Sequence, residues 1–378
     1  AAPGDRTPSG RPHRAFTGIE SLAGFDFEQE SGHICPFCSN ACNRTVIRFA
    51  DGSHFVTGNR CERGEILDDP AAEPAAREKL RRINHQHDFV PNMVEERFRL
   101  LFAKREVTPL VAPTGRTIGI PRALEFWHSY PFWETFWKAL GYEVALSRRS
   151  SQTLYERGLA SVPSDTVCFP AKLSHGHLID LLERGVDRVF MPMINRMPPE
   201  NSRTKSNYVC AVVKGYPLVL DVADEPERRY GVPFDRPMFH WVDRRARAKQ
   251  IVAWAVNSLG VDASVARKAI RMGDSAQTGF EDAMRTRGAE ILSSLEGTDQ
   301  FAVVIAGRPY HADRFVNHDL ATFFVSNDIP VLTVDGLPDL NSTDLSATRP
   351  EMTINFHVRM FSAAIQAARH PNLELVQV

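Results

Sequence analysis

The sequence lacks several features that mark well-defined classes of protein. It has no Gly-x4-Gly-Lys-Ser/Thr stretch, the loop that cradles the phosphates of ATP, so this chain alone is not expected to hydrolyse ATP. No apolar run approaches the ~20 residues needed to span a bilayer, and no signal-peptide pattern opens the chain. We therefore expect a cytoplasmic protein, in a compartment that keeps thiols reduced, without a membrane partner.

An excess of charge of either sign is also missing. Lys and Arg together number 45 and Asp and Glu 46, which gives a formal net charge of −1. Basic residues are scattered, whereas nucleic-acid binders usually show a basic face or stripe, so we expect no nucleic-acid partner. With 43% hydrophobic and 24% charged residues the composition is that of a globular protein, and 378 residues are enough for two or three domains.

Only six cysteines are present, but four of them, Cys35, Cys38, Cys42 and Cys61, fall in one short segment. Clustered cysteines in a chain without secretion signals are more often metal ligands than disulfide partners. A metal would supply the binding energy that so short a segment cannot obtain from a core. The alternative is four reduced cysteines acting as small hydrophobes, which the interspersed asparagines and arginines argue against. The spacing fits an iron–sulfur cluster and a four-cysteine zinc site about equally well.

The residues between Cys42 and Cys61 predict a β-hairpin. Residues 45–58 contain two alternating runs, and Asp51-Gly52 supplies the turn between them. The hairpin would carry Cys42 at its entrance and Cys61 just past its exit. Its geometry therefore brings the fourth thiol back to the first three.

Beyond this segment, short buried strands alternate with helices, which predicts parallel sheets with right-handed crossovers. We expect an α/β fold with two Rossmann-like parallel-sheet units, an N-terminal four-cysteine metal-binding β-hairpin module and a helical connector. The expected parts are a linker (1–30), the four-cysteine module (31–66), the connector (67–114), a first Rossmann-like unit (115–243), a helical segment (244–298) and a second, truncated α/β unit (299–378). The chain begins at Ala1 rather than Met, so we expect a piece of a longer polypeptide.

Local signals place the individual elements. We expect strands over 117–121, 142–146, 188–192, 301–306 and 330–334, and helices over 131–140, 151–158, 170–184, 316–326 and 355–369. Pro131 is expected in the first turn of its helix, where its missing N–H does no harm.

The remaining two cysteines lie in the predicted α/β units. Cys168 precedes Pro170 by two residues, so a helix that begins at Pro170 would place the thiol against its N-terminus. There the unpaired N–H groups and the helix dipole favour the thiolate that a metal ligand or nucleophile needs, and Lys172 adds positive charge. The alternative is an inert buried cysteine. Cys210 has no local partner and by itself is typical of a core residue.

Four further side chains are candidates for binding or catalysis. Arg308 and His311 follow the predicted strand 301–306, and ligand chemistry gathers at the carboxyl ends of strands in parallel sheets. His175 and His177 lie two residues apart and would point to different faces of a helix, so they cannot share an ion. One of them is expected to donate a hydrogen bond to whatever Cys168 holds.

Several blocks of the sequence carry a family resemblance. CPFCSNACNR…GNRCERGE, IGIPRALEFWHSYPFWETFWKALGYEV, SDTVCFPAKLSHGH and AGRPYHAD together resemble the activase-related proteins of the 2-hydroxyacyl-CoA dehydratase group. The match runs from about Gly24 to the end of the chain, in the same order. In those large bacterial proteins, ATP-binding activase domains of the actin-like class precede a dehydratase-like region, and this chain is similar to the latter.

The resemblance implies Rossmann-like domains that hold a [4Fe-4S] cluster between them. An ATP-dependent activase domain or subunit would drive electrons onto the cluster, which in relatives serves the dehydration or reduction of a CoA thioester. Cys168 and Cys210 would be cluster ligands, and the four clustered cysteines would form a separate metal site. The resemblance also implies a Gly-Cys-Gly segment after Val378, so a third thiolate would lie outside this chain. The side chains predicted around the cofactor are Lys172, His175, Arg308 and His311.

Our leading hypothesis is an iron–sulfur electron-transfer or reductase component, fed by an activase and acting on a CoA thioester or another small molecule. The alternative is a non-catalytic, zinc-stabilised α/β binding module within a larger multidomain protein. A third hypothesis is an ordinary Rossmann-like enzyme with His311 or His175 as general acid/base. The sequence fixes no catalytic residue, no substrate and no oligomeric state, for which a homodimer is one option.

Overall fold

The computed structural model describes residues 26–38, 40–85, 88–201, 204, 207–346, 348 and 352–378. Most of the linker predicted for residues 1–30 lies outside these ranges. The chain divides into two compact units, Ala1–Ile83 and Asn84–Val378. No helix in the described ranges is both long and apolar enough to cross a membrane.

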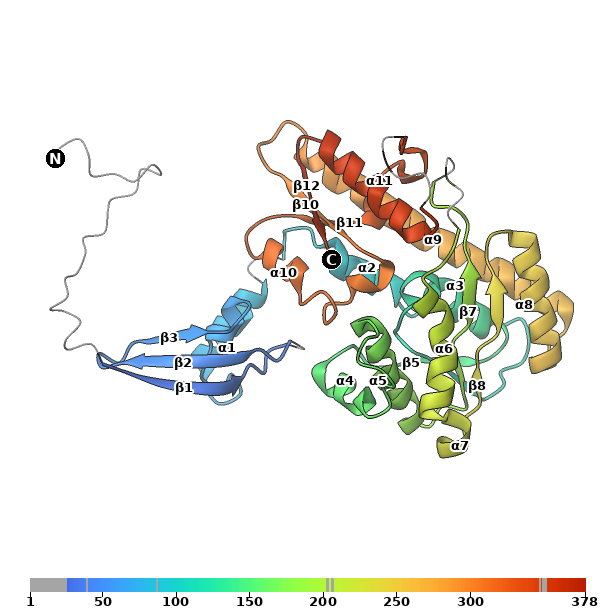
Figure 1. Cartoon of the computed structure of the whole chain (residues 1–378), viewed down its shortest axis with the longest axis horizontal. Coiled ribbons are helices and arrows are strands. Elements are labelled where there is room, and N and C mark those ends of the chain that lie inside the picture. Colours follow the sequence, from blue (N-terminus) through green and yellow to red (C-terminus); the bar gives the residue numbers. More distant parts are fainter. Residues whose placement is uncertain are drawn as a thin grey trace. The chain divides into compact units, whose positions relative to one another are not determined.

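The first unit is built on a three-stranded antiparallel sheet in the order β1-β2-β3 (Figure 1). The predicted hairpin is confirmed as β2 (Asn43–Phe49) and β3 (His54–Thr57), joined by a turn in which Phe49 N donates to Ser53 O at 2.9 Å. β1 (Phe27–Ile34) begins within the segment expected to be a linker. Every residue of β1 is exposed, so its sequence lacks the alternation that signals a half-buried strand. The short helix η2 (Glu62–Glu65) and α1 (Pro74–His85) follow the sheet.

The second unit contains the parallel sheets that the sequence predicts, so the coarse α/β assignment is confirmed. Its first sheet has the order β5-β4-β6-β8, with every neighbouring pair parallel. These strands are β4 (Thr117–Ile120), β5 (Glu143–Leu146), β6 (Arg188–Phe190) and β8 (Phe234–Asp235). A parallel pair, β7 (Met193–Arg196) and β9 (Met238–His240), continues beyond β6 and β8.

A second parallel sheet forms near the end of the chain. Its central strand β10 (Ala302–Ala306) is buried throughout and pairs with β11 (Val331–Thr333) on one side and β12 (Leu373–Gln377) on the other. The short helices η3 (Pro309–Ala312), η4 (Val334–Gly336) and η5 (Leu340–Ser342), α10 (Leu320–Val325) and α11 (Asn355–Arg369) complete this part. Sequence signals found β10, β11 and α11, whereas β12 was not expected.

Helices surround and connect these sheets. The connector contributes α2 (Met93–Leu101), and the first sheet is accompanied by α3 (Phe126–Ala139), α4 (Gln152–Leu159), α5 (Phe169–Glu183), α6 (Ala211–Asp224) and α7 (Pro226–Tyr230). The predicted helical segment forms α8 (Arg244–Leu259) and α9 (Ala263–Leu295). In Figure 1, α9 passes from α8 beside α3 toward the sheet that contains β10.

The predicted start of the helix near Pro131 is wrong. α3 begins at Phe126, so Pro131 lies inside the helix. A proline has no N–H and leaves the carbonyl four residues earlier without its helical partner. Here that carbonyl belongs to Trp127, and Arg97 from α2 donates to it at 2.7 Å. The local helix-start rule failed because a distant side chain replaces the missing hydrogen bond.

The core of the second unit is aromatic and centres on α3. Trp133, Phe136 and Trp137 are fully buried, and the ring centroids of Trp133 and Phe190 lie 4.6 Å apart. Rings in such edge-on or tilted pairs stabilise a core by more than their buried area alone. The sheet of β4 and β6 therefore packs against a helix whose buried side chains are largely rings.

Burial of one carboxyl group in this core generates a testable pH dependence. Glu125, at the start of α3, is 4% exposed. Burial raises its pKa from the ordinary 4.5 to about 8, although a hydrogen bond with Ser129 lowers it in part. The folded protein therefore holds a proton that the unfolded chain releases above its lower pKa. This group's contribution to stability is present at acid pH and is lost as the pH rises through the folded pKa.

We expect the Glu125→Gln variant, which keeps the shape without the titration, to gain a few kcal/mol in unfolding free energy relative to wild type between about pH 5 and pH 9. Urea unfolding at the two pH values measures this gain. Glu156→Gln, on the exposed face of α4, is the matched control and should follow wild type. Parallel pH curves for wild type and Glu125→Gln would contradict the prediction.

Candidate functional site

The first three cysteines of the predicted metal module lie on one tight turn. Cys35 N donates to Cys42 O at 2.8 Å, and Ala41 N donates to Cys38 O at 3.2 Å. These bonds close the loop between β1 and β2. The Cys35 side chain is buried, whereas Cys38 and Cys42 are half-buried. The loop thus gathers three thiols in a short stretch of backbone, as the spacing predicts.

The fourth cysteine returns to the same end of the sheet. Gly58, just after β3, has a φ of +83°, and a methyl group there would overlap the carbonyl oxygen of Asn43. Past this close approach, Asn59 Nδ2 donates to Cys61 O at 3.1 Å. The buried Arg44 then donates to the carbonyl oxygens of Gly64 and Ile66, both at 2.9 Å. The backbone therefore brings Cys61 to the end of the hairpin that carries Cys42.

The backbone brings the four cysteines to one end of the sheet, but a metal site also requires their side chains to converge on one point. Within the ranges that the structure describes, no group of three or more His, Cys, Asp or Glu side chains is arranged to hold a metal ion. The assignment of Cys35, Cys38, Cys42 and Cys61 to a metal site thus stays a prediction, supported by how their backbone segments meet.

In the second unit, both remaining cysteines are N-cap residues of helices. Cys168 precedes α5, as the Cys-x-Pro pattern predicts, and Cys210 precedes α6 in the same way. Neither thiol is used as a capping acceptor. Each sulfur therefore lies at the end of a helix where the backbone N–H groups carry partial positive charge.

Arg308 connects these thiols to the end of β10. Its Nη1 lies 3.8 Å from the Cys210 sulfur and 3.0 Å from the Tyr310 hydroxyl, and its Nη2 lies 2.8 Å from His357 Nε2. Cys168 also interacts electrostatically with Arg308 and Tyr310. Arg308 thus contacts the Cys210 sulfur and interacts electrostatically with Cys168, at the strand end where a ligand was expected.

Arg308 and the groups around it shift one another's pKa values. Burial acts to lower the pKa of Arg308, but Tyr310, Cys210 and Cys168 outweigh it, and the net shift is upward. Burial raises the pKa of Tyr310 to about 12, although Arg308 lowers it in part. Burial and the neighbouring Arg308 lower the pKa of His357, so its Nε2 can accept from the guanidinium. The end of β10 therefore offers one fixed cation beside the Cys210 sulfur and a protonated phenol.

His175 belongs to a second polar chain that leads toward Cys168. Its Nδ1 lies 2.7 Å from Asp224 Oδ2 and its Nε2 lies 3.0 Å from the Tyr216 hydroxyl, all fully or nearly fully buried. Burial raises the pKa of Tyr216 to about 12, with smaller contributions from Cys168 and Asp224. His175 therefore reaches the surroundings of Cys168 through Tyr216. No local signal showed the carboxylate partner, because Asp224 lies at the far end of α6.

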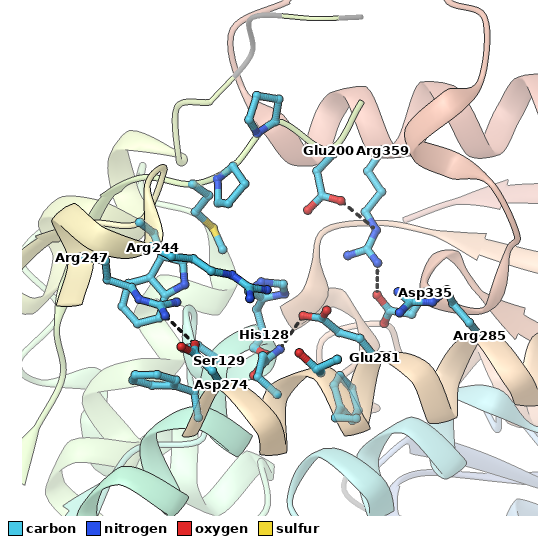
Figure 2. A pocket seen from close by; sticks show the side chains of 18 residues that line it. His128, Ser129, Glu200, Arg244, Arg247, Asp274, Glu281, Arg285, Asp335 and Arg359 are labelled. Carbon is cyan, nitrogen blue, oxygen red and sulfur yellow. Dashed lines mark hydrogen bonds and ion pairs between the residues drawn. The ribbon is translucent and has the colours of Figure 1, made fainter. Parts of the chain in front are cut away.

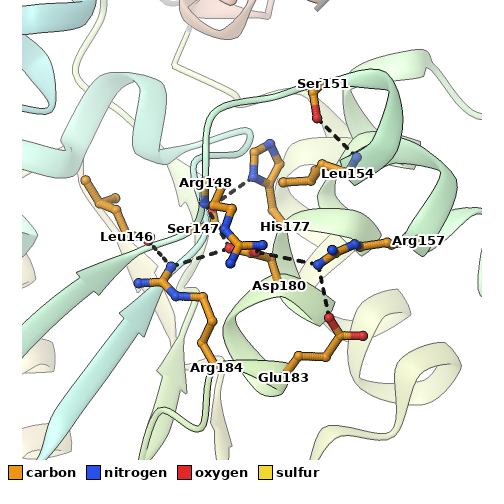
Figure 3. A network of polar contacts seen from close by, with 10 residues as sticks. All are labelled: Leu146, Ser147, Arg148, Ser151, Leu154, Arg157, His177, Asp180, Glu183 and Arg184. Atoms are coloured by element: carbon orange, nitrogen blue, oxygen red, sulfur yellow. Dashed lines mark hydrogen bonds and ion pairs between the residues drawn. The ribbon is translucent and has the colours of Figure 1, made fainter.

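His177 faces elsewhere, as the two-residue spacing predicts. Its Nδ1 and Nε2 lie 2.8 Å and 3.0 Å from the hydroxyls of Ser147 and Ser150. Asp180, one turn later on α5, is 1% exposed and accepts from the backbone N–H of Arg148 at 2.9 Å. Figure 3 shows the arginines that surround Asp180 and so fix α5 against the loop after β5.

The structure does not place the other two predicted residues on the thiols. Lys172 Nζ lies 3.8 Å from Asp165 Oδ1 and contacts no cysteine sulfur among the described residues, although its backbone N–H donates to Cys168 O at 3.2 Å. His311 lines a small cavity of about 30 Å³ together with Arg308, and burial lowers its pKa to about 4. Sequence reasoning missed Tyr216, Tyr310 and His357, of which Tyr310 lies in a loop it had singled out.

The chain is thus a mixed α/β protein that places Arg308 and the Cys210 thiol at the carboxyl end of a parallel strand. Residues 117–337 match the family model described as "CoA enzyme activase uncharacterised domain (DUF2229)", and the chain belongs to this family. The match agrees with the activase-related group expected from the sequence blocks. No curated protein and no solved structure matches the chain.

The position of Cys168 depends on close packing of α4 against α5. A methyl group at Gly176 would overlap the Leu154 carbonyl oxygen, which is rigid backbone. We therefore expect Gly176→Ala to lower the free energy of unfolding by about 1–3 kcal/mol, because the helices must separate. Gly215→Ala on α6, where nothing lies within 4 Å, is the control and should be neutral or stabilising. Equal effects of both changes in urea unfolding would refute this packing argument.

Proposed function

We propose that this protein is an iron–sulfur electron-transfer or reductase component related to the 2-hydroxyacyl-CoA dehydratases and reduced by an ATP-dependent activase. The observation that carries the proposal is the position of Arg308 at the end of β10, 3.8 Å from the Cys210 sulfur and in electrostatic interaction with Cys168. Membership in the family described as a CoA enzyme activase domain supports the proposed partnership with an activase and the relation to CoA-dependent enzymes.

The residues around Arg308 at the end of β10 have the chemistry that an iron–sulfur cluster requires. Thiolates are the usual ligands, and hydrogen bonds and positive charge near the sulfurs tune the reduction potential. Cys168 and Cys210 would hold the cluster, which when bound would supply an electron at low potential. Two thiolates are fewer than the four ligands of a [4Fe-4S] cluster, so groups other than these two cysteines would complete its coordination.

The surrounding side chains would orient and charge-balance this site. Arg308 holds a positive charge within 3.8 Å of the Cys210 sulfur and donates to the Tyr310 hydroxyl. Because that hydroxyl accepts from Arg308, its own proton remains available for another acceptor. His175 joins Asp224 at Nδ1 to the Tyr216 hydroxyl at Nε2 and so fixes that phenol.

A partner would supply ATP chemistry, because the sequence has no phosphate-cradling loop of the Gly-x4-Gly-Lys type. The activase domain or subunit is thus proposed as the electron donor, and a CoA thioester or another small molecule as the acceptor. The four-cysteine module is proposed as a second metal site, with iron–sulfur and zinc as the two chemistries that its ligands suit.

Anaerobic purification or reconstitution with iron and sulfide tests whether Cys168 and Cys210 hold a cluster. We expect wild type to bind about four more iron atoms per chain than Cys168→Ala/Cys210→Ala, with matching acid-labile sulfide and an additional signal in the spectrum of the reduced protein. Circular dichroism and urea unfolding confirm that the double variant folds. Equal iron and sulfide in both proteins would overturn the assignment to Cys168 and Cys210.

A separate pair of variants tests the four-cysteine module. Cys35→Ala/Cys38→Ala should abolish metal binding at this module and destabilise the first unit, because the metal holds the loop together. Metal analysis gives the identity of the ion. Loss of iron and sulfide supports a second cluster, whereas loss of about one zinc with no spectral change supports the zinc-stabilised module. Unchanged metal content would refute the site.

A further inference from the structure

A second, larger cavity lies apart from the two thiols. Its volume is about 260 Å³, and it lies between α3, α9, the segment after β7 and α11 (Figure 2). Pockets for small molecules typically measure ~300–1,000 Å³. This cavity is at the small end, which suits a molecule of amino-acid size and is too small for a whole CoA thioester.

One end of the cavity carries unused positive charge. Arg247 is 4% exposed, and its guanidinium lies 4.6 Å from the Trp241 ring centroid and donates to Asp274 at 2.5 Å. Its buried Nε has no hydrogen-bond partner among the described residues. The exposed Arg244, one turn earlier on α8, also lines the cavity and forms no ion pair within the described ranges. Two guanidiniums thus line this end of the cavity, and of the two only Arg247 is paired with a carboxylate among the described residues.

The other end carries carboxyl groups that are not fully neutralised. Glu200 lies 3.7 Å from Arg359 Nε, beyond hydrogen-bond distance, while Arg359 also binds Asp335 at 2.5 Å. Burial raises the pKa of Glu200, and Asp335 and Glu281 raise it further against the lowering by Arg359. A positively charged group of a ligand would relieve this repulsion.

Neutral groups separate the two ends. Gln277 donates to His128 O at 3.1 Å and to Glu281 Oε1 at 3.0 Å, which leaves its buried Oε1 without a partner among the described residues. Burial and the nearby Arg359 lower the pKa of His128 to about 3, so its ring is uncharged. Figure 2 shows the arginines of α8 on one side of His128 and Glu281 and Glu200 on the other.

We infer that this cavity binds a small zwitterionic metabolite, with its carboxylate toward Arg244 and Arg247 and its ammonium group toward Glu200 and Glu281. The inference rests on the charge distribution of the cavity and does not depend on the iron–sulfur proposal. A molecule with both charges satisfies both ends, whereas a molecule with one charge leaves the other end uncompensated.

Calorimetric titration of the full chain with matched probes tests the inference. 4-Aminobutyrate carries both charges, whereas butyrate and butylamine each keep one of them on the same carbon skeleton. Alanine tests a zwitterion whose charges lie close together. We expect 4-aminobutyrate or alanine to bind at least tenfold more tightly than butyrate and butylamine. Equal affinities for all four probes, or no binding at millimolar concentration, would overturn the inference.

Two variants test which charged group of the ligand binds at each end of the cavity. Arg244→Gln should weaken the binding of 4-aminobutyrate and butyrate about tenfold and leave butylamine unchanged, and Glu281→Gln should weaken 4-aminobutyrate and butylamine. The controls are Arg245→Gln and Glu290→Gln, which change exposed neighbours that do not line the cavity. If each control weakens binding as much as its partner variant, general surface charge accounts for the effect and the site is refuted.

Discussion

A carboxylate that is only 13% exposed is shared by two arginines and joins α2, η4 and α11 in the second unit. Asp335 binds Arg97, which is 1% exposed, and also binds Arg359 at 2.5 Å. Burial alone would raise the pKa of Asp335, but the two guanidiniums hold it well below its usual range. Arg97 in addition donates to the Trp127 carbonyl that Pro131 leaves without a helical partner. Removal of one partner of such a pair typically costs 3–5 kcal/mol, because a charge remains buried without compensation.

The same ion pair forms the partition between two sites. Asp335 and Arg359 line the cavity of about 260 Å³ and also the small cavity of about 30 Å³ behind Arg308. Arg308 in turn contacts Cys210, Tyr310 and His357. The larger cavity and the small cavity that Arg308 lines therefore share Asp335 and Arg359 in their walls.

Local sequence signals located much of this architecture, and their failures have physical causes. Buried strands followed by helices were recognisable because burial on both faces gives continuous apolar runs, as in β10. Cys168 could be placed at a helix start because Pro170 marks one. The strand β1 has no buried face, so its pattern carried no periodicity. Asp224 and His357 reach the site only through tertiary packing, which no spacing along the chain encodes.

Two glycines on α9 give that helix a role beyond covering the sheets. At Gly273 a methyl group would lie 2.8 Å from the Phe132 carbonyl oxygen, and at Gly288 it would overlap the carbonyl of Gly336. Both contacts join backbone to backbone, and 15 residues of helix separate them by about 22 Å. α9 therefore acts as a spacer of fixed length between α3 and η4. Sliding by one residue would drive a side chain into a carbonyl at each end, so the two contacts together fix the register of α9 against α3 and η4.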